Sequence, residues 1–249
     1  MGLLGSLLLL SLSCKEKRQD RLTVAVSANM QLAAEELAAE FTARTGVKCD
    51  LISSSSGKLT AQIREGAPFD IFLSADLTYP ETLFREGFTI SEPLVYAYGR
   101  LILLSVKEGT KPSLQVLESS EVKHIALANP RTAPYGQAAS QVLERLGLSE
   151  SLKEKLVYGE SIAQTNQFIT SGAADIGFTC QSVVHAPEIS KRGKWMELDP
   201  KLYEPIAQAM VVLQGREEFR EEAEKFKDFI LSSEGREILH KFGYLFGSE

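Results

Sequence analysis

Residues 53–76 read SSSSGKLTAQIREGAPFDIFLSAD, in which a serine-rich loop is followed by an amphipathic segment and an apolar run. Before the serines, residues 47–52 are apolar and β-branched and predict a strand, whereas residues 59–65 predict the first turns of a helix. Four hydroxyl side chains therefore lie between a strand end and a helix start. Unpaired backbone N–H groups and a partial positive charge suit such a helix start to binding an anion. The alternative is an ordinary serine cap in a solvated loop.

The same succession of strand, short loop and helix recurs along the chain. We expect strands at 22–26, 47–52, 69–73, 124–128, 155–157, 175–179, 195–198 and 206–213, and helices at 30–45, 59–65, 137–146 and 161–170. This alternation predicts an α/β fold of right-handed βαβ units with mixed, mostly parallel sheets. A helical tail follows from residue 215, and Ser233 is expected to cap its final helix, which runs through Leu239.

Two long apolar runs, at 96–106 and 206–213, are candidates for chain segments that cross between two lobes. Lobe I is expected to comprise residues 22–100 and 206–249, and lobe II residues 101–205. Ligands of parallel α/β sheets bind at the carboxyl ends of the strands, where the helices begin. The pattern therefore predicts a ligand cleft between the two lobes.

Composition narrows the class of partner and of chemistry. The 249 residues carry a net charge of −6, with 44% hydrophobic and 24% charged residues, as in a globular protein. No basic block is present, so a nucleic-acid partner is not expected. The three histidines, His124, His185 and His240, are scattered without metal-ligand spacing, and none accompanies Ser56 as the base that a nucleophile would need.

The N-terminal 21 residues are interpreted as a signal peptide, a lipoprotein cleavage region and a linker. An uncharged, leucine-rich run ends at Ser13, the small residue before Cys14, and a charged segment follows. Cys14 is therefore the expected site of lipidation, which would anchor the protein to a membrane. The alternative is N-myristoylation, because Met1, Gly2 and Ser6 also fit that pattern.

Three further loops share the form of the serine loop, with small or polar residues between a strand end and a helix start. They are residues 27–29, 133–136 and 159–162. Together the four loops could supply backbone N–H groups, the hydroxyls of Ser56 and Tyr135 and the amide of Asn29 to a small tetrahedral anion. No aspartate lies in the loop cores, so an anion that only accepts hydrogen bonds, such as molybdate, tungstate or sulfate, suits them better than hydrogen phosphate.

These segments resemble the periplasmic molybdate-binding proteins of ABC importers. The resemblance covers about residues 22–247 and rests on SANMQLAAEELAAEF, SSSSGKLTAQIREGAPFDIFLSAD, NPRTAPYGQAA and GESIAQTNQFITSGAADIGFT. It implies a two-lobed periplasmic binding protein of type II that holds its ligand by hydrogen bonds alone, with no cofactor and no directly coordinated metal. The ligand positions that it implies are Asn29 with Ala28 beside it, Ser56 with Ser55 beside it, Tyr135, and the backbone N–H of Ile162.

One position departs from the family pattern. Some members place a tyrosine just after the strand of the DIGF motif, where this chain has Cys180. Those members tend to have a small residue at the position of Tyr135, so Tyr135 could supply the phenol from the opposite loop. Cys180 is then expected to line the site at most.

The resemblance implies an extracytoplasmic or periplasmic solute-binding protein, not an enzyme. We expect a monomer that captures molybdate or tungstate and delivers it to the membrane permease of an ABC transporter. A binding protein for sulfate or another oxyanion is the first alternative. An enzyme or a sensor domain on the same fold is a more distant one.

Overall fold

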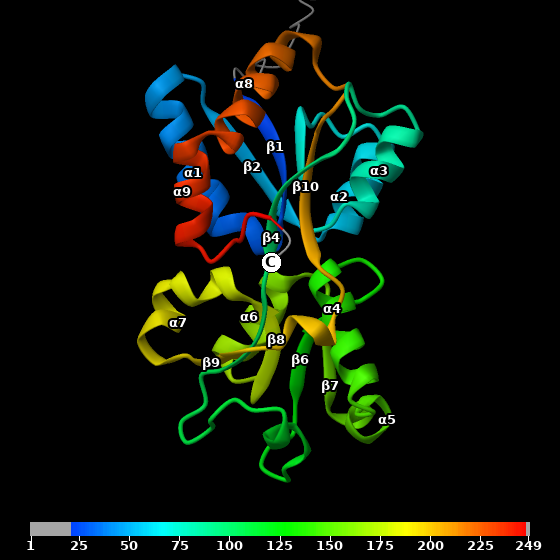
Figure 1. Ribbon diagram of the computed structural model, residues 1–249, viewed down its shortest axis with the longest axis vertical. Coiled ribbons are helices and arrows are strands. Elements are labelled where there is room, and N and C mark those ends of the chain that lie inside the picture. The colour runs from blue at the N-terminus through cyan, green and yellow to red at the C-terminus, as the bar shows by residue number, and fades with distance from the viewer. Residues whose placement is uncertain (1–20, 248–249) are drawn as a thin grey trace, which may run out of the picture.

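The computed structural model describes residues 21–247, and these contain two five-stranded sheets. The first has the order β2-β1-β3-β10-β4 and the second β7-β6-β8-β5-β9, one above the other in Figure 1. The strands of the first sheet are β1 (Leu22–Ser27), β2 (Cys49–Ser54), β3 (Ile71–Ser74), β4 (Leu94–Gly99) and β10 (Ile206–Val212). Those of the second are β5 (Leu101–Ser105), β6 (Ile125–Ala128), β7 (Leu156–Gly159), β8 (Ile176–Cys180) and β9 (Lys194–Glu197).

Helices cover both faces of the first sheet to form lobe I. On one face lie α1 (Gln31–Thr45), α8 (Arg220–Leu231) and α9 (Ser233–Lys241), and on the other α2 (Ser56–Arg64) and α3 (Thr78–Arg85) (Figure 1). The rings of Phe41 and Phe226 pack edge to face, with centroids 5.0 Å apart, and join α1 to α8. The C-terminal helices therefore complete the core of the lobe that contains the N-terminal strand.

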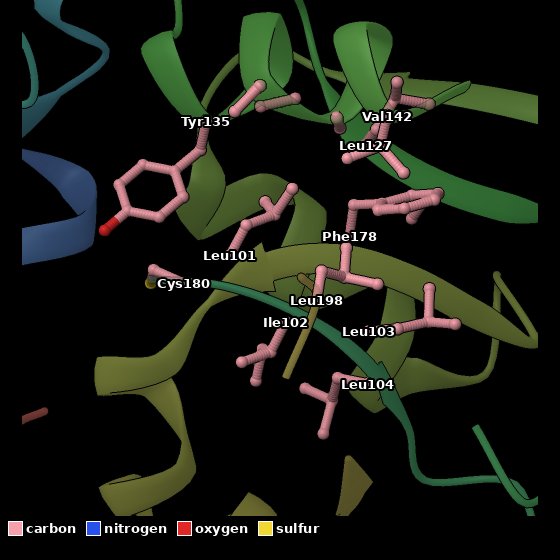
Figure 2. Packing of buried hydrophobic residues seen from close by; sticks show 14 of the residues in the cluster. Leu101, Ile102, Leu103, Leu104, Leu127, Tyr135, Val142, Phe178, Cys180 and Leu198 are labelled. Carbon is pink, nitrogen blue, oxygen red and sulfur yellow. The ribbon is translucent and has the colours of Figure 1, made fainter. Parts of the chain in front are cut away.

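Lobe II is built around the second sheet and its own apolar core. Its helices are α4 (Pro134–Arg145), α5 (Ser149–Leu152), α6 (Ile162–Ser171) and α7 (Pro187–Arg192). In Figure 2 the side chains of Ile102 and Leu104 of β5 lie on the opposite side of the strand from Leu127 and Phe178, so residues of one apolar cluster cover both faces of this strand. All four residues of Leu101–Leu104 are fully buried, which explains why this segment is uniformly apolar rather than alternating.

The chain crosses between the lobes twice. Only Arg100 separates β4 from β5, and the return path lies between β9 and β10. β1 pairs in parallel with β2 and β3, whereas β10 runs antiparallel to β3 and β4. The expected α/β fold with two lobes and mixed sheets is confirmed. The division of the chain into lobe I at 22–100 and 206–249 and lobe II at 101–205 stays a prediction.

The apolar run at 96–106, expected as a segment that crosses between the lobes, forms two strands in different sheets, and the chain changes lobe at Gly99–Arg100. Other local details differ from the sequence prediction. The cap of α9 is Ser232 rather than Ser233, since the Ser232 hydroxyl accepts the hydrogen bond from Gly235 N–H, at 3.1 Å. Helices α3, α5 and α7 are additional to the helices predicted above.

The predicted signal segment and the lipidation residue Cys14 lie outside residues 21–247. Within that range no helix is both long enough and apolar enough to cross a membrane. Cys49 and Cys180 are both free thiols.

Candidate anion site between the lobes

The four loops named above meet at one small cavity. The volume of this cavity is about 10 Å³. Its lining residues are Ser27, Ala28, Asn29, Ser55, Ser56, Ala75, Ala133, Pro134, Tyr135 and Ile162. All six residues expected to bind the ligand are among them, and they come from four loops, two in each lobe. Their contact with an anion stays a prediction.

Helix starts surround this cavity. α2 begins at Ser56, α4 at Pro134 and α6 at Ile162, and a 3₁₀ turn over Ala28–Met30 leads into α1. The first backbone N–H groups of a helix have no partner inside the helix and carry its positive dipole end. The cavity therefore receives partial positive charge from several directions without a cationic side chain among its lining residues.

The two adjacent serines have different surroundings. Ser56 Oγ accepts a hydrogen bond from Ala75 N–H at 3.0 Å and lies 3.0 Å from Ser27 Oγ. Because Ser27 donates its own proton to Leu73 O, at 2.9 Å, the proton of Ser56 is directed to Ser27. Ser55 Oγ, in contrast, is buried and has no hydrogen-bond partner among residues 21–247. The geometry thus favours Ser55 over Ser56 as the hydroxyl that faces a ligand.

Asn29 is held by partners far away in the sequence. Its side-chain amide donates to Gln208 Oε1 at 2.7 Å and to Tyr244 Oη at 3.0 Å. These two bonds use both amide hydrogens, so the side chain of Asn29 has no N–H left for a ligand. In this arrangement the expected contribution of the amide to the donor set has no free hydrogen behind it, and contact of Asn29 with a ligand stays a prediction. What the Asn29 loop can offer is backbone N–H groups.

Tyr135 enters the cavity from α4. Its ring belongs to the buried core of lobe II, and in Figure 2 its hydroxyl points out of that core. Burial raises the pKa of Tyr135 well above the ordinary phenol value of 10.0, with smaller contributions from neighbouring groups, led by Tyr244 and Cys180. The phenol is therefore a neutral O–H donor throughout the physiological pH range.

Direct contacts join the lobes around the cavity. Gly57 N–H donates to Thr132 O at 2.9 Å, and a Cβ at Gly57 would lie 3.0 Å from Thr132 Cα. Glycine is therefore needed here for the approach of the opposite lobe. The hydroxyl of Ser182 in lobe II donates to Asn29 O at 2.7 Å. Lys58 Nζ forms an ion pair with Glu160 across the cleft.

The side chains that line the cavity are not those of a typical metal site. No carboxylate, histidine or thiol is among the residues that line the cavity. Within residues 21–247, no cluster of three or more His, Cys, Asp or Glu side chains could hold a metal ion.

Cys180 lines a neighbouring hollow of about 270 Å³ rather than this cavity, and burial raises the pKa of its thiol. Asp76, which also flanks a loop, accepts a hydrogen bond from Tyr79 N–H at 3.2 Å and so caps α3.

Three residues that surround the cavity were not predicted from the sequence. Gln208, Tyr244 and Ser182 are all buried and all bond to Asn29. Of these three, only Gln208 could have been singled out from the sequence, because it is the one polar residue in the otherwise apolar strand IAQAMVV. Nothing in the local sequence points from Tyr244 or Ser182 to Asn29.

The sequence and the fold of this chain are similar to those of known solute-binding proteins. A model of the family described as bacterial extracellular solute-binding protein matches residues 22–245. The molybdate-binding protein ModA of Azotobacter vinelandii is 40% identical over 224 residues, which are 89% of this chain and 88% of that protein. ModA of Rhodobacter capsulatus is 38% identical over 225 residues, 89% of this chain and 86% of that protein. The solved structure of the periplasmic molybdate-binding protein from A. vinelandii matches with a TM-score of 0.86 and 34% identity, covering 92% of this chain and 100% of its own.

Proposed function

This chain belongs to the family of bacterial extracellular solute-binding proteins and, within it, to the ModA-type proteins, and on that premise we propose that it captures molybdate or tungstate. A member of this family carries a solute to a transporter and does not convert it, so the chain is not an enzyme. No resident cofactor is needed, because molybdenum would be bound as its oxyanion by protein hydrogen-bond donors.

The observation that carries the proposal is the unpartnered Ser55 hydroxyl in a cavity without acids. A buried hydroxyl without a partner costs free energy in the empty protein, and an anion that accepts its hydrogen bond removes that cost. Tyr135 and Ile162, in the first turns of α4 and α6, line the cavity from the other lobe. A fully ionised oxyanion suits these donors, whereas hydrogen phosphate would leave its own proton without an acceptor.

Binding would stabilise the arrangement in which the lobes touch. Donors on α2 belong to lobe I and donors on α4 and α6 belong to lobe II, so only an anion between them can use both sets. The anion would therefore bind the closed protein more tightly than the open one and shift the population toward closure. A closed, loaded protein is the form that a membrane permease would receive.

Family membership places the protein outside the cytoplasm, in the periplasm or its equivalent. Beyond this, we propose that Cys14 carries a lipid that keeps the protein at the membrane surface and that the protein acts as a monomer. Metabolic labelling with a fatty acid would test the first point, with Cys14→Ser as the matched control. Light scattering of the purified protein would test the second.

The function is tested by isothermal titration with molybdate, tungstate, sulfate and phosphate under one set of conditions. We expect saturable binding of molybdate and tungstate with one site per chain, and no binding of phosphate. Tight binding of sulfate with weak binding of molybdate would instead support the sulfate alternative. Preference for phosphate would overturn the argument from the missing acceptor.

A further inference from the structure

We propose that Gln208 and Tyr244 are positioning residues of the anion site, which fix the Asn29 loop without touching the ligand. This inference rests on the proposed function and extends it to residues that do not line the cavity. It starts from the finding that the amide hydrogens of Asn29 are used inside the protein.

Gln208 bonds the Asn29 loop directly and reaches the serine loop through Ala75. Its Oε1 accepts from Asn29 Nδ2 at 2.7 Å, and its Nε2 donates to Ala75 O and to Ile206 O, each at 3.2 Å. Ala75 in turn donates its N–H to Ser56 Oγ, at 3.0 Å. A continuous chain of hydrogen bonds therefore runs from the β1 loop, through Gln208, to the loop that contains both serines.

Gln208 also lies where the register of the sheet changes. The pairing of β10 with β4 shifts between Gln208 and Ala209, as in a β-bulge. A bulge changes the direction of a side chain relative to a regular strand. Gln208 is fully buried, and each of its polar atoms has a partner, so its side chain is confined to one arrangement.

Tyr244 fixes the same loop from the C-terminal segment. Its hydroxyl donates to Asn29 O at 2.9 Å and accepts from Asn29 Nδ2 at 3.0 Å. One phenol thus clamps both the backbone and the side chain of Asn29. Since Asn29 O also accepts from Ser182 of lobe II, the clamp holds the point at which the opposite lobe meets this loop.

The experiment compares Gln208→Met with Gln214→Met in the full chain. Methionine keeps the length of glutamine but cannot make its hydrogen bonds, and Gln214 lies just beyond β10, where it bonds Thr89 O. For Gln208→Met we expect molybdate affinity to fall roughly tenfold to a hundredfold, as for other residues that orient ligand-binding groups. For Gln214→Met we expect a change of less than about twofold. Tyr244→Phe, which keeps the ring in the core, should lose affinity in the same direction.

Hydrogen–deuterium exchange on the ligand-free proteins separates positioning from general stability. We expect faster exchange in Gln208→Met that is confined to segments 27–30 and 74–76. Unchanged affinity and exchange would overturn the proposal, and so would faster exchange spread over the whole chain, which indicates only a structural role. If the unmodified protein binds no oxyanion, the proposed function fails, whereas the exchange comparison still decides whether Gln208 fixes the loop.

Discussion

Lys58 on α2 and Glu160 just before α6 form an ion pair that spans the cleft between the lobes. Each residue is two positions from a predicted ligand residue, Ser56 on one side and Ile162 on the other. The side chains are 42% and 70% exposed, so the pair lies at the rim and not in the cavity. It can form only while the lobes are close together, which makes it a contact of the closed state.

We expect Lys58→Ala to weaken molybdate binding by about twofold to fivefold at low salt, since an exposed ion pair contributes little. The loss should vanish at high salt, because mobile ions screen an exposed pair. Isothermal titration at two ionic strengths measures both effects. Lys225→Ala removes an exposed ion pair within α8, to Glu221, and should leave affinity unchanged. An equal loss at both ionic strengths would show that Lys58 acts by some means other than the pair.

The two cavity serines should respond in opposite ways to replacement by alanine. Ser55→Ala should lower molybdate affinity by roughly 1.5–3 kcal/mol, the contribution of a hydrogen bond to a charged group. It should leave the empty protein at least as stable as before, because the unpartnered hydroxyl costs that state free energy. Ser56→Ala should instead lower the stability, because Ala75 N–H loses its acceptor. Titration and thermal unfolding of both variants make the comparison. A loss of affinity confined to Ser56→Ala would reverse the assignment.

The meeting of the four loops at one cavity was predictable because it follows from local order along the chain. Strand–loop–helix units place their loops at the carboxyl ends of the strands, so residues as distant as Ala28 and Ile162 were expected in one cleft, and both line the same cavity. Errors in helix boundaries, such as Ser233 in place of Ser232 as the cap of α9, are small, because the two serines are adjacent and either hydroxyl can cap a helix.

The choice of donors was not predictable, because it depends on partners that only the folded chain supplies. Asn29 meets Gln208 across 179 positions and Tyr244 across 215. Ser55 and Ser56 are the same residue type at adjacent positions. The Ser56 hydroxyl bonds the N–H of Ala75 and the hydroxyl of Ser27, whereas the Ser55 hydroxyl has no partner among residues 21–247. Periodicity and helix-start patterns carry no information about such contacts.

Alkaline pH should destabilise the protein through its buried phenols. Burial raises the pKa of Tyr135, Tyr244 and Tyr96 above the ordinary value of 10.0. Above about pH 10 the unfolded chain therefore loses protons that the folded protein keeps, so the free energy of unfolding falls as pH rises. Below that pH the same groups stay neutral in both states, and stability should not depend on them. Thermal unfolding from about pH 8 to about pH 11 measures this slope.

Replacing one buried phenol should flatten the alkaline slope. Tyr96→Phe is the informative variant, because the Tyr96 hydroxyl is buried without a partner among residues 21–247 and is not part of the cavity. Tyr158→Phe is the control, since that side chain is 53% exposed. Equal slopes for these two variants would contradict the role of burial.

The buried carboxylate of Asp70 forms an ion pair with the partly exposed Arg216 at the end of β3 away from the cavity. Asp70 is 2% exposed, and its carboxylate accepts from Arg216 Nη2 at 2.5 Å and from Thr23 N–H at 2.7 Å. Asp70→Asn would leave the guanidinium without its charged partner, and we expect the free energy of unfolding to fall by about 3 kcal/mol. Urea unfolding followed by circular dichroism measures the change.

The same variant separates stability from binding, because Asp70 precedes β3 whereas Ala75 of the cavity follows it. Molybdate affinity of folded Asp70→Asn should therefore stay within about twofold of the unmodified protein, given the additivity of distant sites. Asp228→Asn is the matched control, since this aspartate is 74% exposed on α8 and should change neither property. A large loss of affinity in Asp70→Asn would mean that β3 transmits strain from one end of lobe I to the ligand loops.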